Sequence, residues 1–280
     1  MKFHQKAFFY RIMPFDTRRI NGPESSVDYR KFCGKVKKSK SNNRGQNRSK
    51  DDQHRALVLN TGIVSKAQGS AYIEQGQTKA ICAVYGPREI PRKSDFSMKG
   101  ILNCTFERAP FARTRRQASG PQNLDAEEEE VSKTLSEALQ ATVCMHLYPK
   151  SQIDVYVTIL EDDGSALAAS ITVASLALAD AAVQMFDTIV GISLKRLSDR
   201  VLIDPTKAEE EEVGEGQFDR GQITIGYQPS LEQVSLMTSE GHMSKEHLIK
   251  DLKVLAKQSL ELVRQLQLCL VQSVKESMNE

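Results

Sequence analysis

The chain has 280 residues, long enough for one large domain or two small ones with a substantial core. Its 38 basic and 36 acidic residues nearly cancel, which excludes a uniformly basic nucleic-acid-binding surface and leaves only local patches for that role. There is no apolar run of the roughly 18 residues that a membrane span needs, no secretory-signal pattern and no paired cysteine spacing, so we expect a soluble protein of a reducing compartment.

The first part of the chain differs in composition from the rest. Between Lys35 and Lys50, seven basic residues and no acidic residue are interleaved with Ser, Asn and Gly. Such a segment buries too little apolar area to offset its ordering entropy, so residues 1–53 are predicted to be an extension with a flexible basic insertion over about 35–53. A solvated loop is the favoured interpretation of the insertion, and a nuclear-import signal or an RNA-contacting tail are the alternatives.

From residue 54 to residue 280 the pattern indicates a globular domain. Its first half is predicted to contain strands at residues 56–64, 69–73, 78–85 and 102–106, with a hairpin turn over 74–77. Apolar residues then recur at three- and four-residue spacing from Val131 to Val143, which predicts a helix that begins in an acidic run and ends before Pro149.

The second half is predicted to open with an alternating strand at residues 152–160. A helix over 166–185 follows, and small residues on all its faces predict that neighbouring elements surround it. Further strands are expected at 188–194, 201–203, 221–226 and 233–237, before a long amphipathic helix with leucines from Leu248 to Leu270. This order predicts an α/β fold (α+β, with mixed sheets) of two β-α-β-α halves.

Familiar catalytic motifs are absent: the sequence has no GxxxxGK[ST], GxGxxG, HExxH or GxSxG, and its histidines lack metal-binding spacing. One junction, Asp162-Asp163-Gly164-Ser165, places a glycine at a helix start, where free backbone N–H groups can hold an anion. The acids Glu161, Asp162 and Asp163 directly before it would repel that anion. Composition alone therefore favours a tight structural turn.

Several stretches together resemble the ribonuclease PH family. They are residues 69–89 (GSAYIEQGQTKAICAVYGPRE), Arg108-Ala109-Pro110-Phe111, the junction with the helix behind it, and residues 229–234 (PSLEQV). They occur in the family's order over roughly 54–275, and the resemblance implies a fold of two β-α-β-α units. Within the family, residues 160–167 and 202–207 are most similar to one type of ring subunit of the eukaryotic RNA exosome.

Active members of that family cut RNA from its 3′ end with inorganic phosphate, which arginines hold. Alignment of the neighbouring helices places Glu127 and Leu167 at the two arginine positions. Leucine offers no hydrogen bond, and a like charge at about 4 Å costs roughly 4 kcal/mol at an effective dielectric constant of about 20. The resemblance therefore predicts a chain that does not bind phosphate, is not an enzyme and needs no cofactor.

The family also carries two aspartates, six residues apart, that bind metal and assist proton transfer. Asp204 and Glu210 occupy the matching positions here, so one is kept and one is replaced conservatively. The run Glu209 to Glu212 either attracts a cation or is a solvated acidic loop, and we favour the loop. Without a bound phosphate nucleophile phosphorolysis is excluded, whereas metal-assisted hydrolysis stays open.

Two basic clusters are candidates for RNA contact, because cations on phosphates are the main requirement for sequence-independent binding of single strands. They comprise Arg88, Arg92, Lys93, Arg108, Arg113, Arg115 and Arg116. The alternative is that these residues pair with acids of this chain or of a neighbouring subunit.

The resemblance implies further partners and a location: related ring subunits, S1/KH-type cap proteins, single-stranded RNA and no membrane, in nucleus (nucleolus) and cytoplasm. We expect a non-catalytic ring subunit, and keep an active phosphate-dependent exoribonuclease and a scaffold without RNA contact as alternatives.

Overall fold

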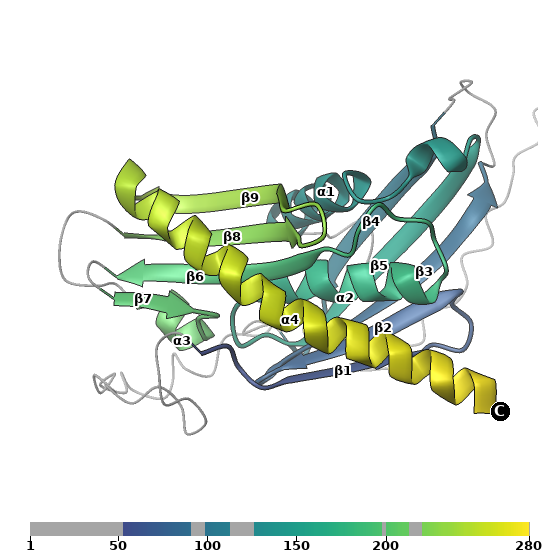
Figure 1. Cartoon of the computed structure of the whole chain (residues 1–280), viewed down its shortest axis with the longest axis horizontal. Helices are drawn as coiled ribbons and strands as arrows, with labels where there is room; N and C mark the ends of the chain where they lie inside the picture. Colours follow the sequence, from purple (N-terminus) through teal and green to yellow (C-terminus); the bar gives the residue numbers. More distant parts are fainter. Residues whose placement is uncertain (1–52, 91–98, 113–125, 198–199, 213–219, 280) are drawn as a thin grey trace, which may run out of the picture.

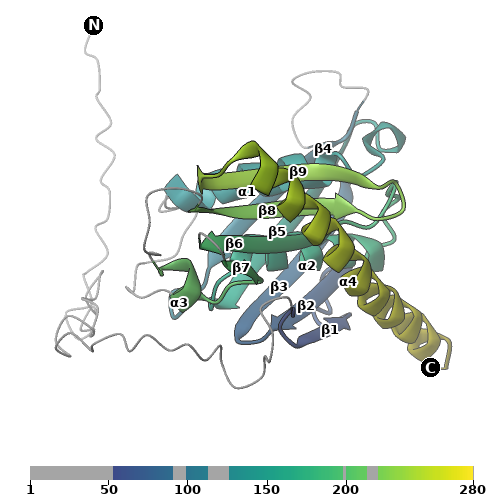
Figure 2. The same cartoon turned by 60° about the vertical axis from the view of Figure 1, so that its left-hand side comes forward.

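The computed structural model describes residues 53–90, 99–112, 126–197, 200–212 and 220–279. The chain forms two β-sheets with helix α2 (Ala166–Asp180) between them, and helix α4 (Lys245–Asn279) crosses the molecule diagonally (Figures 1 and 2). The C-terminal end of α4 extends beyond the sheets (Figure 1). No helix in the described part of the chain has the length and apolar character to cross a membrane.

The first sheet has the strand order β1-β2-β3-β5-β4. Its strands are β1 (Leu57–Thr61), β2 (Gly69–Gln75), β3 (Thr78–Glu89), β4 (Ile101–Arg108) and β5 (Ser151–Glu161). β1, β2, β3 and β5 pair antiparallel in that order, whereas β4 runs parallel to β5 at one edge. Alternation along β5 turns Val155 and Val157 into the core and leaves the ring of Tyr156 on the opposite face.

The second sheet is antiparallel, with the order β7-β6-β8-β9. Its strands are β6 (Val190–Leu197), β7 (Arg200–Ile203), β8 (Arg220–Gln228) and β9 (Gln233–His242). The short helix α3 (Lys207–Glu210) follows β7. α4 packs against β6, where the buried side chains of Arg196 and Asp251 form an ion pair.

The remaining helical elements belong to the first half: α1 (Ala126–Gln140), which packs on β4, and a 3₁₀ turn, η2 (Met145–Leu147). The central helix α2 is buried at every residue from Ala168 to Leu178. It approaches β6 so closely that a Cβ on Gly191 would lie 2.3 Å from the carbonyl oxygen of Ala168. The prediction that small residues let neighbours surround this helix is confirmed.

The predicted α/β class with two β-α-β-α halves is confirmed, and two details of it were wrong. β5 belongs to the first sheet, so the second half begins after α2. The helix predicted over 166–185 ends at Asp180, because Ala182 is left-handed (φ 54°) and the N–H groups of Ala182 and Val183 bond back to Ala179 and Leu178. The predicted N-terminal extension, residues 1–53 with its insertion, lies almost wholly outside the described residues.

Candidate functional site

The candidate site is centred on the β5–α2 turn, residues 161–165. Its backbone is left-handed at Gly164 (φ 87°) and Ser165 (φ 56°). A Cβ on Gly164 would lie 2.6 Å from the carbonyl oxygen of Pro205 and from the amide nitrogen of Lys207. The turn therefore lies directly against the segment after β7, so closely that only glycine fits at position 164. That segment carries both sequence-predicted acids, Asp204 and Glu210.

Carboxylates of the chain itself bond the backbone N–H groups of the turn. The Ser165 N–H donates to Oε1 of Glu210 at 2.9 Å, and the side-chain amide of Gln222 donates to the same oxygen at 3.0 Å. The Gly164 N–H donates to Oδ1 of Asp162 at 3.3 Å. An anion that bound these two N–H groups would have to displace both carboxylates.

Burial also shapes the acidity of the turn. It raises the pKa of the Glu210 carboxyl above its ordinary value, and the bonds from Ser165 and Gln222 only partly oppose this shift. Burial likewise raises the pKa of Asp163, against the lowering effect of the nearby Arg55 guanidinium. Burial in the fold therefore disfavours the ionised form of both carboxyl groups.

Asp204 is fully buried and its carboxylate is saturated with hydrogen bonds. It accepts from Nε (2.8 Å) and a terminal nitrogen (2.6 Å) of Arg55, from the Arg55 backbone N–H (3.1 Å) and from the side-chain amide of Gln75 (2.6 Å). A carboxylate of this kind has no lone pair directed at solvent. Its role in this geometry is to join the first sheet to the second.

Arg55 extends the same network to the turn. Its guanidinium donates to the carbonyl oxygens of Asp163 (2.9 Å) and Gly164 (3.2 Å), and to the Thr78 hydroxyl (3.2 Å). One buried arginine therefore fixes Asp204 and the β5–α2 turn together.

Groups of the chain itself also bond the acidic segment after β7. The Lys195 ammonium donates to the carbonyl oxygens of Glu209 (2.8 Å), Glu210 and Glu212 (3.0 Å). Glu209 and Thr206 form a capping box at the start of α3. In the described part of the chain, no three His, Cys, Asp or Glu residues are grouped to hold a metal ion. The carboxylates of Asp204 and Glu210 do not fit a metal ion in this arrangement, because Arg55 and Gln75 already bond the first and Ser165 and Gln222 the second.

The two positions predicted to replace phosphate-binding arginines have different surroundings. The Glu127 side chain is 70% exposed and lies 2.9 Å from a terminal nitrogen of Arg108, whose Nε lies 3.5 Å from the Asp162 carboxylate. Leu167 is half-buried and packs against the hydrophobic core. Glu127 is thus linked to the β5–α2 turn through Arg108, and Leu167 contributes only apolar contact.

Of the predicted RNA-binding residues, the two that the structure describes, Arg88 and Arg108, do not lie in one cluster. Arg88 pairs with Gln152 near the start of β5 and Arg108 with Ile159 near its end, about 23 Å apart at roughly 3.3 Å per residue. Arg88 forms an ion pair with Asp154, and Arg108 is engaged as described above. The other candidates lie outside the described residues, namely Arg92, Lys93, Arg113, Arg115 and Arg116.

Sequence reasoning missed the partners that decide the chemistry of the turn. Arg55, Gln75, Lys195 and Gln222 are far from it in sequence, and no local pattern separates them from surface residues. Asp154 did carry a signal, since it is an acid inside an apolar alternating strand and such a position requires a nearby cation.

Comparison with known proteins gives a consistent result. Residues 53–184 match the model of the RNase PH 3′ exoribonuclease family, domain 1, and residues 187–255 match domain 2 of that family. The exosome complex component MTR3 of Mus musculus is 37% identical over 245 residues, covering 82% of this chain and 84% of the relative. The human MTR3 is 38% identical with the same coverage. The exosome complex component Rrp41 of Pyrobaculum neutrophilum is 37% identical over 207 residues, covering 74% and 81%.

Solved structures share the fold. The crystal structure of rice (Oryza sativa) Rrp46 superposes with a TM-score of 0.69 at 23% identity, covering 80% of this chain and 98% of the other. An Archaeoglobus fulgidus exosome with RNA bound to the active site gives 0.66 at 21% identity, covering 80% and 92%.

Proposed function

Because the chain belongs to the RNase PH family of 3′ exoribonucleases, we propose that it is a non-catalytic ring subunit of an RNA exosome. The specific type is that of the mRNA transport regulator MTR3, also called exosome component six, and two MTR3 relatives at 37% and 38% identity support it. In this role the chain completes a hexameric ring of related domains and helps to line the RNA channel, while another chain cuts the RNA.

One observation carries the non-catalytic part of the proposal. The backbone N–H groups of Ser165 and Gly164, directly before α2, donate to the carboxylates of Glu210 and Asp162, and these carboxylates oppose the binding of a phosphate nucleophile there. The pairing of Glu127 with Arg108 reinforces this, since a cation that lies 3.5 Å from the Asp162 carboxylate already has a carboxylate partner. Phosphorolysis needs a bound phosphate, and this geometry opposes its binding.

The direct test is to incubate the protein, assembled with the related subunits that copurify with it, with RNA, Mg²⁺ and phosphate. We expect no release of nucleoside diphosphates attributable to this chain. Release that requires phosphate, and that is lost in Glu210→Ala while the assembly keeps its native mass, would favour the alternative of an active exoribonuclease.

The proposed partners are the other RNase PH-like ring subunits, S1/KH-type cap proteins and single-stranded RNA. Replacing Arg113, Arg115 and Arg116 with Glu should weaken RNA crosslinking to the assembled ring without dissociating it; unchanged crosslinking would favour a pure scaffold. The proposed location is the nucleus, including the nucleolus, and the cytoplasm. Deleting the Lys35 to Lys50 segment from a fluorescent fusion tests whether that segment directs nuclear entry.

A further inference from the structure

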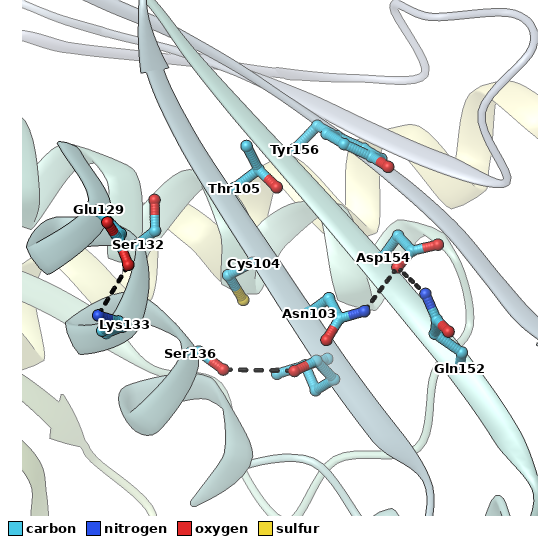
Figure 3. Close-up of a pocket in the computed structure, with 11 residues that line it drawn as sticks. Asn103, Cys104, Thr105, Glu129, Ser132, Lys133, Ser136, Gln152, Asp154 and Tyr156 are labelled. Carbon is cyan, nitrogen blue, oxygen red and sulfur yellow. Dashed lines mark hydrogen bonds and ion pairs between the residues drawn. The ribbon is translucent and has the colours of Figure 1, made fainter. Parts of the chain in front are cut away.

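A groove runs along strand β4, between helix α1 and the side chains of β5 (Figure 3). Its volume is about 510 Å³. The β5 residues that line it come from the first half of that strand, so the groove is separate from the β5–α2 turn, which follows the end of the strand. We propose that this groove binds one nucleobase of single-stranded RNA, stacked on Tyr156, and prefers bases with an exocyclic amino group. The choice of RNA as the ligand class rests on the proposed function.

The stacking surface is the ring of Tyr156, which is 44% exposed. The ring of Tyr85 supports it edge-to-face, with the centroids 5.9 Å apart and the planes at 71°. The Arg88 guanidinium lies 5.9 Å from the Tyr85 centroid and completes the support. A ring held in this way offers its exposed part to a base with little loss of side-chain entropy, and such stacking is sequence-tolerant.

Hydrogen-bond acceptors lie beside this ring. The amide nitrogens of Asn103 (3.3 Å) and Gln152 (2.6 Å) both donate to Oδ1 of Asp154 (Figure 3). Each side-chain amide thus keeps its second N–H and its carbonyl oxygen for a ligand. The carbonyl oxygen can accept from the exocyclic amino group of adenine while the N–H donates to its N7, and uracil lacks this amino group.

The sheet register places these groups on one face. Asn103 is the β4 neighbour of Asp154, and Thr105 is the β4 neighbour of Tyr156. Alternate residues of a strand share a face, so the acceptors, the Thr105 hydroxyl and the tyrosine ring lie on the same side of the sheet.

The charges of the groove cancel. Asp154 forms an ion pair with Arg88, and Glu129 forms one with Lys133 at 2.9 Å. A groove without net charge selects neither a free phosphate nor a divalent cation, and it suits an uncharged planar group.

The test measures fluorescence anisotropy of the full-length chain with labelled pentaadenylate and pentauridylate. We expect tighter binding of pentaadenylate. Tyr156→Ala should lower its affinity about fivefold or more, since one stacked base contributes at least about 1 kcal/mol. Tyr156→Phe should retain the affinity, and Asn103→Ala should reduce the preference for adenylate over uridylate.

Tyr72→Ala is the matched control, because Tyr72 lies on β2 of the same sheet and outside the groove. It should leave the affinity unchanged. The proposal is wrong if Tyr156→Ala has no effect on RNA affinity, or if Tyr156→Ala and Tyr72→Ala lower it equally. It is also wrong if Tyr156→Ala weakens only assembly with related subunits, because the groove would then bind a protein side chain. Failure of the chain to copurify with such subunits would contradict the proposed function and leave the anisotropy result intact.

Discussion

The polar groups of the β5–α2 turn bond mainly one another, whereas those of the groove along β4 keep atoms available for hydrogen bonds to a ligand. At the turn and the adjoining segment after β7, the carboxylates accept from the Arg55 guanidinium and from backbone N–H groups, so an incoming anion would have to displace them. In the groove, Asp154 accepts one amide proton each from Asn103 and Gln152, and each amide keeps a second N–H and its carbonyl oxygen for a ligand. Similar side chains therefore build a closed structural junction in one region and a surface suited to a ligand in the other.

This difference has an energetic counterpart. Removing one partner from a buried, saturated network leaves an uncompensated charge, whereas a half-exposed groove residue can be hydrated after a substitution. The predictions below, from the largest expected effect to the smallest, compare changes at the junction with changes in the groove.

Asp204→Asn should have the largest effect. Asparagine tolerates the left-handed backbone at this position (φ 53°), so the variant mainly removes the charge that Arg55 bonds. Breaking a buried ion pair costs about 3–5 kcal/mol, and we expect the free energy of unfolding in urea to fall by this amount. Asn103→Ala in the groove should change it by no more than about 0.5 kcal/mol. Equal effects of the two variants would contradict the comparison.

Gly191→Ala should have an intermediate effect. The added Cβ would meet backbone atoms of Ala168 in α2, which cannot move as the end of a flexible side chain can. Overpacking of this kind costs about 1–3 kcal/mol, measurable as a lower midpoint of thermal or urea unfolding. Thr105→Ala in the groove serves as the control, and an unchanged midpoint in Gly191→Ala would show that α2 is not tightly enclosed.

Glu210→Gln should have the smallest effect, visible mainly through its pH dependence. Because burial raises the pKa of this carboxyl above its ordinary value of 4.5, ionising it opposes folding. Its contribution to stability therefore falls as pH rises from the ordinary value through the raised one, whereas glutamine does not titrate and still accepts from Ser165. Relative to the natural chain, the variant should therefore gain stability as the pH rises above 4.5, the ordinary pKa of this carboxyl.

The measurement is the free energy of unfolding of both proteins across that range. A difference that stays constant with pH, or that changes in the opposite direction, would mean that burial does not oppose the ionisation of Glu210. Tyr156→Phe, which alters the groove and no carboxyl group, should show the pH dependence of the natural chain.

The sequence predicted the architecture because the architecture depends on local periodicity. Alternation along residues 152–160 and the small residues of the helix after Gly164 each report directly which faces are buried. The end of that helix was missed because Ala182, without the glycine that usually marks a left-handed residue, takes that conformation through backbone bonds to Leu178 and Ala179.

The sequence predicted which acids belong to the candidate site, but not which residues they bond. Alignment with the family located Asp204 and Glu210, yet their bonding depends on Arg55, which is 149 residues from Asp204, and on Ser165, which is 45 residues from Glu210. Single-sequence patterns do not encode such pairings. The groove was missed for the same reason, since it forms where β4 and β5 become neighbours across the intervening α1.

The central claim is that carboxylates of the chain fill the anion position at the start of α2. Its most direct test is to follow the backbone amide resonances of Gly164 and Ser165 by NMR while phosphate is added to the full-length chain. Our account predicts no saturable shift at either amide up to tens of millimolar phosphate. A saturable shift of the Ser165 amide at low millimolar phosphate would contradict it.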